Sequence, residues 1–168
     1  MKRIILSALL ISFWSVMCIA QKKHNDMPRV DIKTLEGKMV SARSILKGKP
    51  TVVSFWATWC KPCVKELSAI HDAWPDWEEE IDFTMIAISV DDSRSEHRVA
   101  PFVKGRSWEF DIYLDPNSDL KRALNVATVP HTFVFDAKGK LVWQHSGYTE
   151  GDEEELLEKL KSLSDKLP

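Results

Sequence analysis

The chain has 168 residues, of which 44% are hydrophobic and 29% charged, and its formal net charge is −2. A chain of this length and composition can bury the core of one domain and stay soluble. Because the charges nearly balance, nothing in the composition points to nucleic acid or an anionic membrane surface as a partner, and we expect no nucleic-acid binding.

The first twenty residues differ from the rest of the chain. Lys2 and Arg3 precede a mostly apolar segment at residues 4–20. A charged start followed by a short apolar run is typical of a secretory signal peptide. The residues that close the run fit a small-x-small cleavage site, so we predict cleavage after Ala20. An uncleaved N-terminal anchor is one alternative, because the apolar run is near the lower length for a membrane span.

A lipoprotein signal, with Cys18 as the lipidated residue, is the other alternative. Bulky Met17 argues against it, since lipoprotein signals have a small residue at that position. We therefore predict a signal peptide or anchor at residues 1–20, a short polar tether at 21–28 and one domain at 29–168. The predicted location is periplasmic or otherwise extracytoplasmic.

The first elements of the predicted domain are a hairpin, a buried strand and a long helix. Residues 30–41 alternate in polarity around a Glu-Gly-Lys turn, which predicts a β-hairpin. Residues 51–56 form an apolar run that predicts a buried strand, and a helix follows from about Cys60. Pro75 is predicted to end or kink this helix, because its ring has no N–H to donate to the preceding turn.

The middle of the domain is predicted to hold a second central strand and a second helix. Residues 83–90 are rich in Ile and Val and predict the strand. Ser93-Arg94-Ser95-Glu96 is a capping-box pattern that predicts the start of a helix ending near Gly105. Pro101 lies inside this helix, so we expect a kink or a late start.

The last part of the domain is predicted to alternate strands and helices again. Asp152 with Glu155 is expected to cap the final helix. The elements are a strand at 110–114, a short helix through Leu124, strands at 132–135 and 141–144 joined by a turn at Gly139, and a helix from Asp152 to about Leu163. This order predicts an α/β fold with a central mixed sheet and helices on both faces.

Trp59-Cys60-Lys61-Pro62-Cys63 stands directly after the strand predicted at 51–56. Removal of residues 1–20 takes Cys18 away and leaves only this pair of cysteines. The mature protein would then carry no structural disulfide in an oxidising compartment. Two cysteines three residues apart at a helix start indicate a thiol–disulfide exchange site.

The predicted helix start assigns different roles to the two cysteines. A sulfur at the positive end of the helix dipole, near unpaired N–H groups, is favoured as the thiolate, so Cys60 is predicted to attack. Cys63 lies one turn later, about 5–6 Å away, and is predicted to resolve the mixed disulfide. Pro62 is tolerated because N–H groups in the first turn have no intrahelical acceptor.

Glu66 and Trp59 flank the cysteine pair. Glu66 lies three residues after Cys63, where a partly buried carboxylate could accept the proton of the resolving thiol. The alternative is a solvated glutamate favoured by the helix dipole. Trp59 is predicted to shield the disulfide and to contribute to substrate binding, the alternative being an aromatic residue that only packs in the core.

Val129-Pro130 precedes the strand predicted at 132–135. A cis bond here would leave the backbone N–H and C=O of Val129 facing outward, where an extended substrate could pair with them. Composition alone favours the trans form.

We expect no metal and no other cofactor. A structural zinc site needs four ligands, and the histidines of the chain lack zinc-finger spacing from the two cysteines. A copper- or zinc-carrying protein that uses Cys60, Cys63 and His131 is the alternative outside enzymes.

These features together resemble the thioredoxin superfamily, specifically its TlpA/ResA-like extracytoplasmic branch. The similarity extends over about residues 28–165 and rests on residues 31–37, 48–50 and 55–63 and on Val129-Pro130. It implies a thioredoxin fold with an added N-terminal β-hairpin, a cis Pro130 near the disulfide, and a role for Glu66 in tuning the thiols.

The resemblance also implies an activity, reduction of disulfides in exported proteins, including apocytochrome c in some members. The partners would be such proteins and a membrane thiol reductant as electron donor, and we expect a monomer. A disulfide-forming oxidant is one alternative, because dithiol proteins of this geometry have very different potentials. A thiol peroxidase is another, but such proteins have Pro and Thr where this chain has Val53 and Ala57.

Three positions depart from cytoplasmic thioredoxin. Ser54 replaces a buried Asp that accepts a proton there, which leaves Glu66 as the better candidate. Lys61 replaces Gly, and its charge either helps the Cys60 thiolate or is simply solvated. His131 follows the proline where Thr is common, and we expect a surface or packing role for it.

Overall fold

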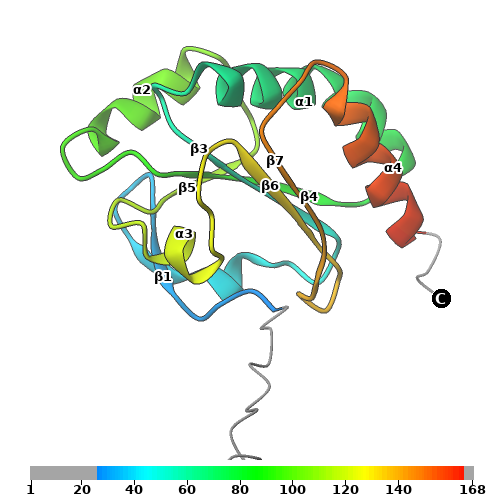
Figure 1. Cartoon of the computed structure of the whole chain (residues 1–168), viewed down its shortest axis with the longest axis horizontal. Helices are drawn as coiled ribbons and strands as arrows, with labels where there is room; N and C mark the ends of the chain where they lie inside the picture. Colours follow the sequence, from blue (N-terminus) through cyan, green and yellow to red (C-terminus); the bar gives the residue numbers. More distant parts are fainter. Residues whose placement is uncertain (1–25, 165–168) are drawn as a thin grey trace, which may run out of the picture.

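A seven-stranded sheet lies at the centre of the computed structural model, which describes residues 26–164 (Figure 1). The strands are β1 Asp31–Thr34, β2 Met39–Ser41, β3 Thr51–Trp56, β4 Thr84–Ser89, β5 Asp111–Leu114, β6 His131–Phe135 and β7 Leu141–Ser146. The helices are α1 Lys61–Glu80, α2 Val99–Lys104, α3 Asp119–Ala123 and α4 Asp152–Ser164, with 3-10 turns at Ala42–Ile45 and Glu96–Arg98. The predicted signal peptide or anchor at residues 1–20 lies outside the described residues.

β3 and β4 form the middle of the sheet, whose order is β2-β1-β5-β4-β3-β6-β7. β3 is parallel to β4 and antiparallel to β6, and β4 is parallel to β5. β1 pairs antiparallel with β2 and with β5, and β6 pairs antiparallel with β7. Every residue of β3 and β4 is buried, which explains why both segments are apolar runs without alternation. The predicted mixed sheet is confirmed.

Helices cover both faces of the sheet, as predicted. Figure 1 shows α1, α2 and α4 over one face and α3 over the other. Leu67 of α1 and Leu160 of α4 are fully buried in the first core, and Leu120 of α3 is fully buried in the second. The sheet lies between the two cores, so the strands place each of their buried side chains on one side or the other.

β3 divides its side chains between the two cores. Val52 and Trp56 pack in the core beneath α1, whereas Val53 and Phe55 pack in the opposite core. Ser54 lies between them in the alternation and therefore faces α1. This placement brings the Ser54 hydroxyl under the first turns of the helix that carries the cysteines.

α1 continues through Pro75 to Glu80, so the prediction that this proline ends the helix is wrong. The proline removes the hydrogen bond to the carbonyl of His71. Two residues later, however, Trp77 is 4% exposed and its ring centroid lies 6.2 Å from that of Phe83. Burial of this indole contributes on the order of 3 kcal/mol, comparable to the cost of a proline inside a helix.

The second helix starts differently from the predicted capping box. The predicted box pairs the Ser93 hydroxyl with the backbone N–H of Glu96, but this N–H donates to the carbonyl of Asp92 at 2.8 Å. The Asp92 carboxylate accepts hydrogen bonds from the backbone N–H and the hydroxyl of Ser95. A 3-10 turn at Glu96–Arg98 precedes α2, and Pro101 is the third residue of α2, where its missing N–H has no intrahelical acceptor. The predicted late start is confirmed, and the capping box is wrong because the carbonyl of Asp92 accepts the Glu96 N–H and its carboxylate holds the preceding turn.

The start of α4 uses the predicted Asp152, but with a different partner: its backbone N–H donates to the carbonyl of Thr149 at 3.0 Å. Asp152 accepts a hydrogen bond from the backbone N–H of Thr149, and Glu153 accepts one from Gly151. Glu155 therefore does not form the reciprocal bond of a capping box with Asp152. The turn before β7 does follow the prediction, since Gly139 has a φ of +78°.

The packed domain extends further toward the N-terminus than predicted. Met27, which lies in the predicted tether at residues 21–28, is 1% exposed and belongs to the second core. Its backbone N–H donates to the carbonyl of Gly139 at 3.2 Å, and Asp26 forms a bridge with Lys140. The hydrophobic Met side chain explains the earlier boundary, because it fills the space beside the β6–β7 turn. None of the helices within residues 26–164 is long and apolar enough to span a membrane.

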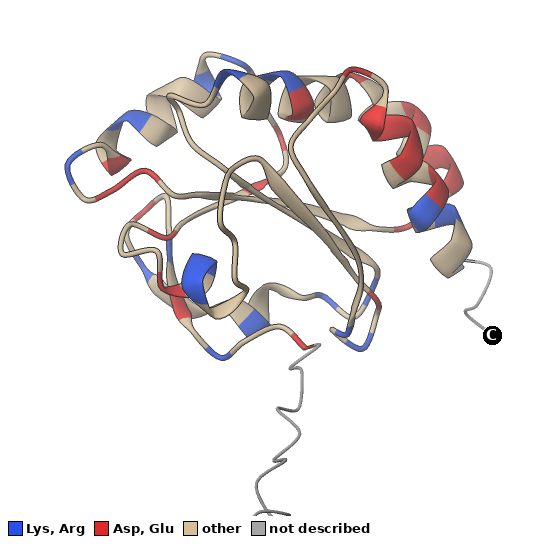
Figure 2. Ribbon diagram, in the orientation of Figure 1, with Lys and Arg blue, Asp and Glu red and all other residues tan. Residues whose placement is uncertain are grey.

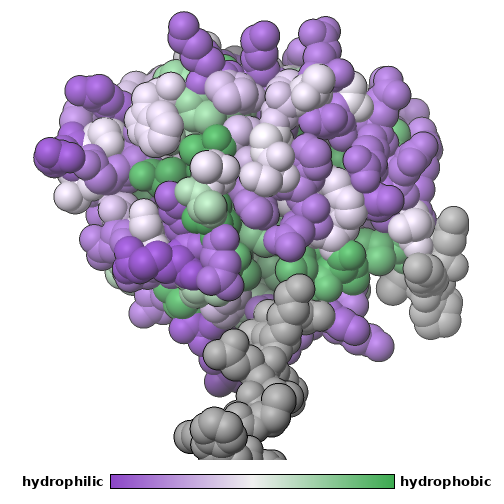
Figure 3. All heavy atoms as spheres, in the orientation of Figure 1, coloured by the Kyte–Doolittle hydropathy of each residue, from purple (hydrophilic) through white to green (hydrophobic). Residues whose placement is uncertain are grey.

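The surface of the domain is largely hydrophilic on the face seen in Figure 3, with apolar side chains visible in smaller areas. Three large hydrophobic residues are exposed among the described residues, namely Met39, Trp59 and Val142. Only Trp59 adjoins the cysteine pair.

Candidate active site

Cys60 and Cys63 form a disulfide where β3 leads into α1. Cys60 is the N-cap of α1, and its Sγ accepts a hydrogen bond from the backbone N–H of Cys63 at 3.3 Å. The two Cα atoms are 5.3 Å apart, in agreement with the predicted spacing. Cys60 is 5% exposed and Cys63 is fully buried. The sulfur of Cys60 is therefore the one nearer to solvent and the one at the positive end of the helix.

A buried aspartate holds the turn before Cys60. Asp91 follows the end of β4 and is 0% exposed. Its carboxylate accepts hydrogen bonds from the backbone N–H of Thr58 at 2.8 Å, from the hydroxyl of Thr58 at 2.6 Å and from the hydroxyl of Ser89 at 2.8 Å. Asp91 was missed in the sequence because nothing local links it to residue 58. Its position directly after a buried strand, beside the strand that precedes the cysteines, could have suggested it.

Glu66 lies beneath the sheet-facing side of α1 and is 6% exposed. One carboxylate oxygen accepts a hydrogen bond from the Ser54 hydroxyl at 3.0 Å and the other from the Thr132 hydroxyl at 2.7 Å. Burial raises the pKa of Glu66 to about 7, although the two hydroxyls act in the opposite direction. The alternative of a solvated glutamate is therefore wrong. A carboxyl with this pKa can both accept and release a proton near neutral pH.

The two tryptophans at the end of β3 have different environments. Trp59 is 67% exposed and does not pack in the core. Trp56 is fully buried, with ring centroids of Trp108 and Phe102 at 5.3 and 5.6 Å. Trp59 is thus free to contact a bound substrate, and Trp56 supports the floor of the site.

The Val129–Pro130 peptide bond is cis, as the resemblance implied. Pro130 is buried, and its carbonyl accepts a hydrogen bond from the backbone N–H of Gly147. Val129 is partly buried, and within residues 26–164 its backbone N–H and C=O have no hydrogen-bond partner. Because β6 pairs with β3, this segment lies at the same end of the sheet as the cysteine pair.

His131 packs against its own strand. Its ring stacks on Phe133 at 4.4 Å between centroids, and its Nε2 lies 3.3 Å from the amide oxygen of Gln144. Burial lowers the pKa of His131. Among the described residues, no three His, Cys, Asp or Glu side chains are grouped closely enough to hold a metal. Lys61 is exposed on the first turn of α1.

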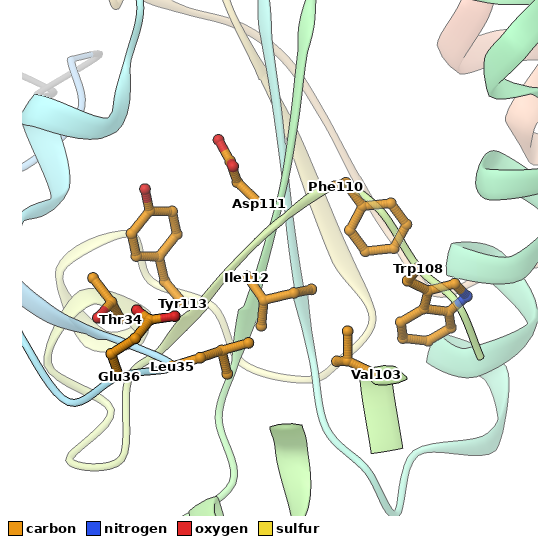
Figure 4. Close-up of a pocket in the computed structure, with 9 residues that line it drawn as sticks. All are labelled: Thr34, Leu35, Glu36, Val103, Trp108, Phe110, Asp111, Ile112 and Tyr113. Carbon is orange, nitrogen blue, oxygen red and sulfur yellow. The ribbon is translucent and has the colours of Figure 1, made fainter. Parts of the chain in front are cut away.

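A separate hollow of about 290 Å³ lies at the start of β5 and contains none of the predicted site residues. Figure 4 shows its lining, with Trp108 and Phe110 on one side and Tyr113 and Glu36 on the other.

A disulfide across the first turn of a helix that follows the central strand of a mixed sheet defines a thiol-disulfide oxidoreductase with a thioredoxin fold. The chain belongs to the AhpC/TSA family, whose model matches residues 24–144.

Similar proteins of other bacteria are named as thiol-disulfide oxidoreductases. The thiol-disulfide oxidoreductase ResA of Bacillus thuringiensis is 30% identical over 139 residues, which cover 83% of this chain and 77% of ResA. The sporulation thiol-disulfide oxidoreductase A of Bacillus subtilis is 29% identical over 136 residues, covering 79% of each chain.

Solved structures agree on the fold. A thioredoxin-like protein from Porphyromonas gingivalis is 42% identical, with a TM-score of 0.76 over 85% of this chain and 94% of that one. StoA from Bacillus subtilis is 25% identical, with a TM-score of 0.60 over 78% of this chain and 99% of that one.

Proposed function

We propose that the protein reduces disulfides in exported proteins, outside the cytoplasm, by means of the Cys60–Cys63 pair. One observation carries this proposal: Cys60 caps α1, and its Sγ accepts the N–H of Cys63. When the pair is reduced, the same N–H and the helix dipole would stabilise a thiolate on Cys60. Lys61, the first residue of α1, is exposed, so the proposed stabilisation of the thiolate does not depend on its charge.

The reaction proceeds in two exchanges. The Cys60 thiolate attacks one sulfur of the client disulfide, forms a mixed disulfide and releases the other client sulfur as a thiolate. Cys63 then loses its proton to the Glu66 carboxylate and attacks the Cys60 sulfur. A Cys60–Cys63 disulfide forms, and the second client sulfur leaves. Two electrons pass from the cysteine pair to the client, whose two thiolates take protons from solvent.

Client binding is assigned to the surface around Cys60. Trp59 offers an exposed indole face beside the disulfide. Val129 offers an unpaired backbone N–H and C=O, which an extended client segment could use like an added strand. Pro130 holds the end of this segment through its bond to Gly147.

The proposed partners follow from the direction of electron flow. A protein that reduces clients outside the cytoplasm needs a thiol donor, and we assign this to a membrane thiol reductant that restores the dithiol. The client class is disulfide-containing exported proteins, with apocytochrome c as one member. The names of the relatives support thiol-disulfide exchange, and the apolar run after Lys2 and Arg3 supports export.

Cysteine variants test the function. Cys60→Ser should lower the rate of insulin disulfide reduction to background, a loss of at least about 1000-fold, because the attacking sulfur is gone. Cys63→Ser should instead accumulate a mixed disulfide on Cys60, visible as a protein–client adduct that dithiothreitol releases. Full insulin reduction by Cys60→Ser would overturn the proposal.

The redox potential of the pair tests the direction. A value near about −270 mV fits a reductant, whereas one near about −120 mV fits a disulfide-forming oxidant. Equilibration with glutathione or dithiothreitol, followed by thiol labelling, measures it.

A further inference from the structure

A narrow crevice leads from Glu66 to the surface between β7 and α4. It is lined by Glu66, Thr132, His145, Tyr148, Asp152 and Glu153, with apolar side chains between them, and neither cysteine lines it. The crevice offers about 10 Å³ to the centre of a water molecule, which is the room that a single water needs. Apart from Glu66 and its neighbours on α1, the walls of this crevice come from β6, β7, the segment after β7 and α4, and not from the active-site turn.

The inner and outer ends of this crevice are joined by the β6–β7 pairing. Thr132, whose hydroxyl donates to Glu66, is the cross-strand partner of His145. Directly paired residues of antiparallel strands point to the same face of a sheet, so both side chains face the α1 and α4 side. The His145 Nε2 lies 3.3 Å from the Asp152 carboxylate, and each of these side chains is about one-third exposed, at 35% and 33%.

Charges around the outer end favour a proton on Glu66. Asp152 and Glu153 raise the pKa of Glu66 in addition to its burial. Tyr148 donates its hydroxyl hydrogen to Glu153 at 2.8 Å, and its own pKa is raised by burial and by this carboxylate. Asp152 and Glu153 belong to the acidic first turn of α4, and Figure 2 shows how acidic residues gather on this helix. His131, on the neighbouring strand, is the remaining titratable group that interacts with His145.

Glu66, as the proposed proton acceptor of the site, needs a route by which it can release a proton. In each reductive cycle it takes one proton from Cys63. That proton must leave Glu66 for solvent whenever Cys63 regains its own proton from the incoming thiol donor rather than from Glu66. Its buried position prevents direct exchange with bulk water. His145 places an imidazole, the side chain most often used as a proton shuttle, at the surface end of the crevice.

We propose that the His145–Asp152 pair carries the proton between Glu66 and solvent through this crevice. The inference rests on the role proposed for Glu66 in resolving the mixed disulfide. In the step, protonated Glu66 gives its proton to a water in the crevice, and this water passes a proton to the imidazole nitrogen of His145 that does not face Asp152. The imidazolium, stabilised by the Asp152 carboxylate beside Nε2, then releases a proton to solvent. No electrons move in this step, and the Glu66 carboxylate is restored.

The test measures repeated turnover of a disulfide client, and separately the resolution of a single mixed disulfide by stopped flow, using the fluorescence of Trp56 and Trp59. His145→Gln should slow repeated turnover about tenfold near pH 7 in dilute buffer, because loss of a proton-transfer group removes part of its acid–base contribution. Added imidazole should restore the rate in proportion to its concentration. Asp152→Asn should show a smaller loss in the same direction. The redox potential of the cysteine pair should stay unchanged in both variants.

His97→Gln is the matched control, because His97 is an exposed histidine remote from the crevice. It should turn over like the unchanged protein. If Glu66→Gln slows resolution while His145→Gln is normal and independent of buffer, the proton route is overturned and the proposed function stands. If Glu66→Gln has no effect on resolution, the role of Glu66 fails first. A slow His145→Gln that imidazole does not restore, with a shifted potential, would mean a structural role and would also overturn the route.

Discussion

Two buried carboxylates, Asp91 and Glu66, lie on either side of the active-site turn and are held in different ways. Asp91 accepts a hydrogen bond from a backbone N–H, on Thr58, in addition to two hydroxyl groups. Glu66 accepts hydrogen bonds from two hydroxyls only, on Ser54 and Thr132. Both carboxylates are removed from water, but only Glu66 is bound entirely by hydroxyls, which can either donate or accept a hydrogen bond.

This difference separates a structural carboxylate from a reactive one. A backbone N–H can only donate, so the oxygen that faces it must remain an acceptor. A hydroxyl can donate to a carboxylate or accept from a carboxylic acid. Glu66 can therefore gain or lose a proton without leaving a partner unsatisfied, whereas Asp91 is suited to fixing the turn that carries Cys60.

Removal of the structural carboxylate should give the largest effect. Asp91→Ala is expected to lower the free energy of unfolding by about 4 kcal/mol, because the N–H of Thr58 and two hydroxyls lose their buried acceptor. Urea unfolding of the oxidised protein measures this loss. Asp91→Asn, which keeps one acceptor oxygen, should lose less. A change below about 1 kcal/mol in Asp91→Ala would remove the contrast with Glu66.

Removal of the reactive carboxylate should change the pH dependence of stability. Burial raises the pKa of Glu66 from 4.5 to about 7, so the folded state binds this proton more tightly than the unfolded state. The stabilisation is fully present below about pH 4.5 and is lost as the pH rises through about 7. Glu66→Gln should be more stable than the unchanged protein at pH 8 by about 3 kcal/mol, and nearly equal to it at pH 4.5.

Unfolding of both proteins in urea across this pH range tests the expectation. Glu158→Gln, on the surface of α4, is a control that should leave the pH profile unchanged. Parallel curves for Glu66→Gln and the unchanged protein would show that Glu66 titrates normally.

Removal of the Thr132 hydroxyl should show how far the hydroxyl partners of Glu66 control its pKa. Thr132→Val deletes a hydrogen bond that lowers the pKa of Glu66, so this pKa should rise, and stability at pH 8 should fall by about 1 kcal/mol. The carbonyl band of the protonated Glu66 side chain, followed by infrared spectroscopy against pH, reports the shift. An unchanged titration midpoint would contradict the assigned role of this hydroxyl.

Thr84→Val provides the smallest effect and a matched control. Thr84 is buried at the start of β4, and within residues 26–164 its hydroxyl has no hydrogen-bond partner. Its replacement by a side chain of the same shape should be neutral or stabilising, by up to about 1 kcal/mol, because no hydrogen bond is lost. The infrared titration of Glu66 should not move. Thermal and urea unfolding, compared with Thr132→Val, separate the loss of a used hydroxyl from that of an unused one.

The strands and the cysteine turn could be predicted because their patterns are local. An apolar run of six residues, Thr51 to Trp56, is long enough for a buried strand, and the motif after it contains both cysteines and the helix start. Errors fall at helix ends, where a single side chain decides the outcome. The carbonyl of Asp92 accepts the Glu96 N–H that the predicted Ser93 cap would need, and the burial of Trp77 offsets the cost of Pro75 through contacts that the local pattern does not show.

In the site, too, residues close in sequence could be predicted, whereas partners brought together by the fold could not. Glu66 was found because it lies one turn from Cys63 on the same helix. Its two hydroxyl partners come from β3 and β6, and Ser54 was noted only as a departure from thioredoxin, not as a partner. Asp91 and His145 reach the site through the strand order, with β4 beside β3 and β7 beside β6, which spacing along the chain does not reveal.

The packing of Met27 fixes where the N-terminal end of the domain lies relative to Cys60. The backbone of Met27 bonds to Gly139 in the β6–β7 turn, and β6 runs antiparallel to β3, so this end of the sheet is where β3 begins. Cys60 lies beyond the other end of β3, about 20 Å away along a strand of this length. A domain held from its N-terminal side would therefore turn its reactive sulfur outward, toward arriving clients rather than toward whatever holds it.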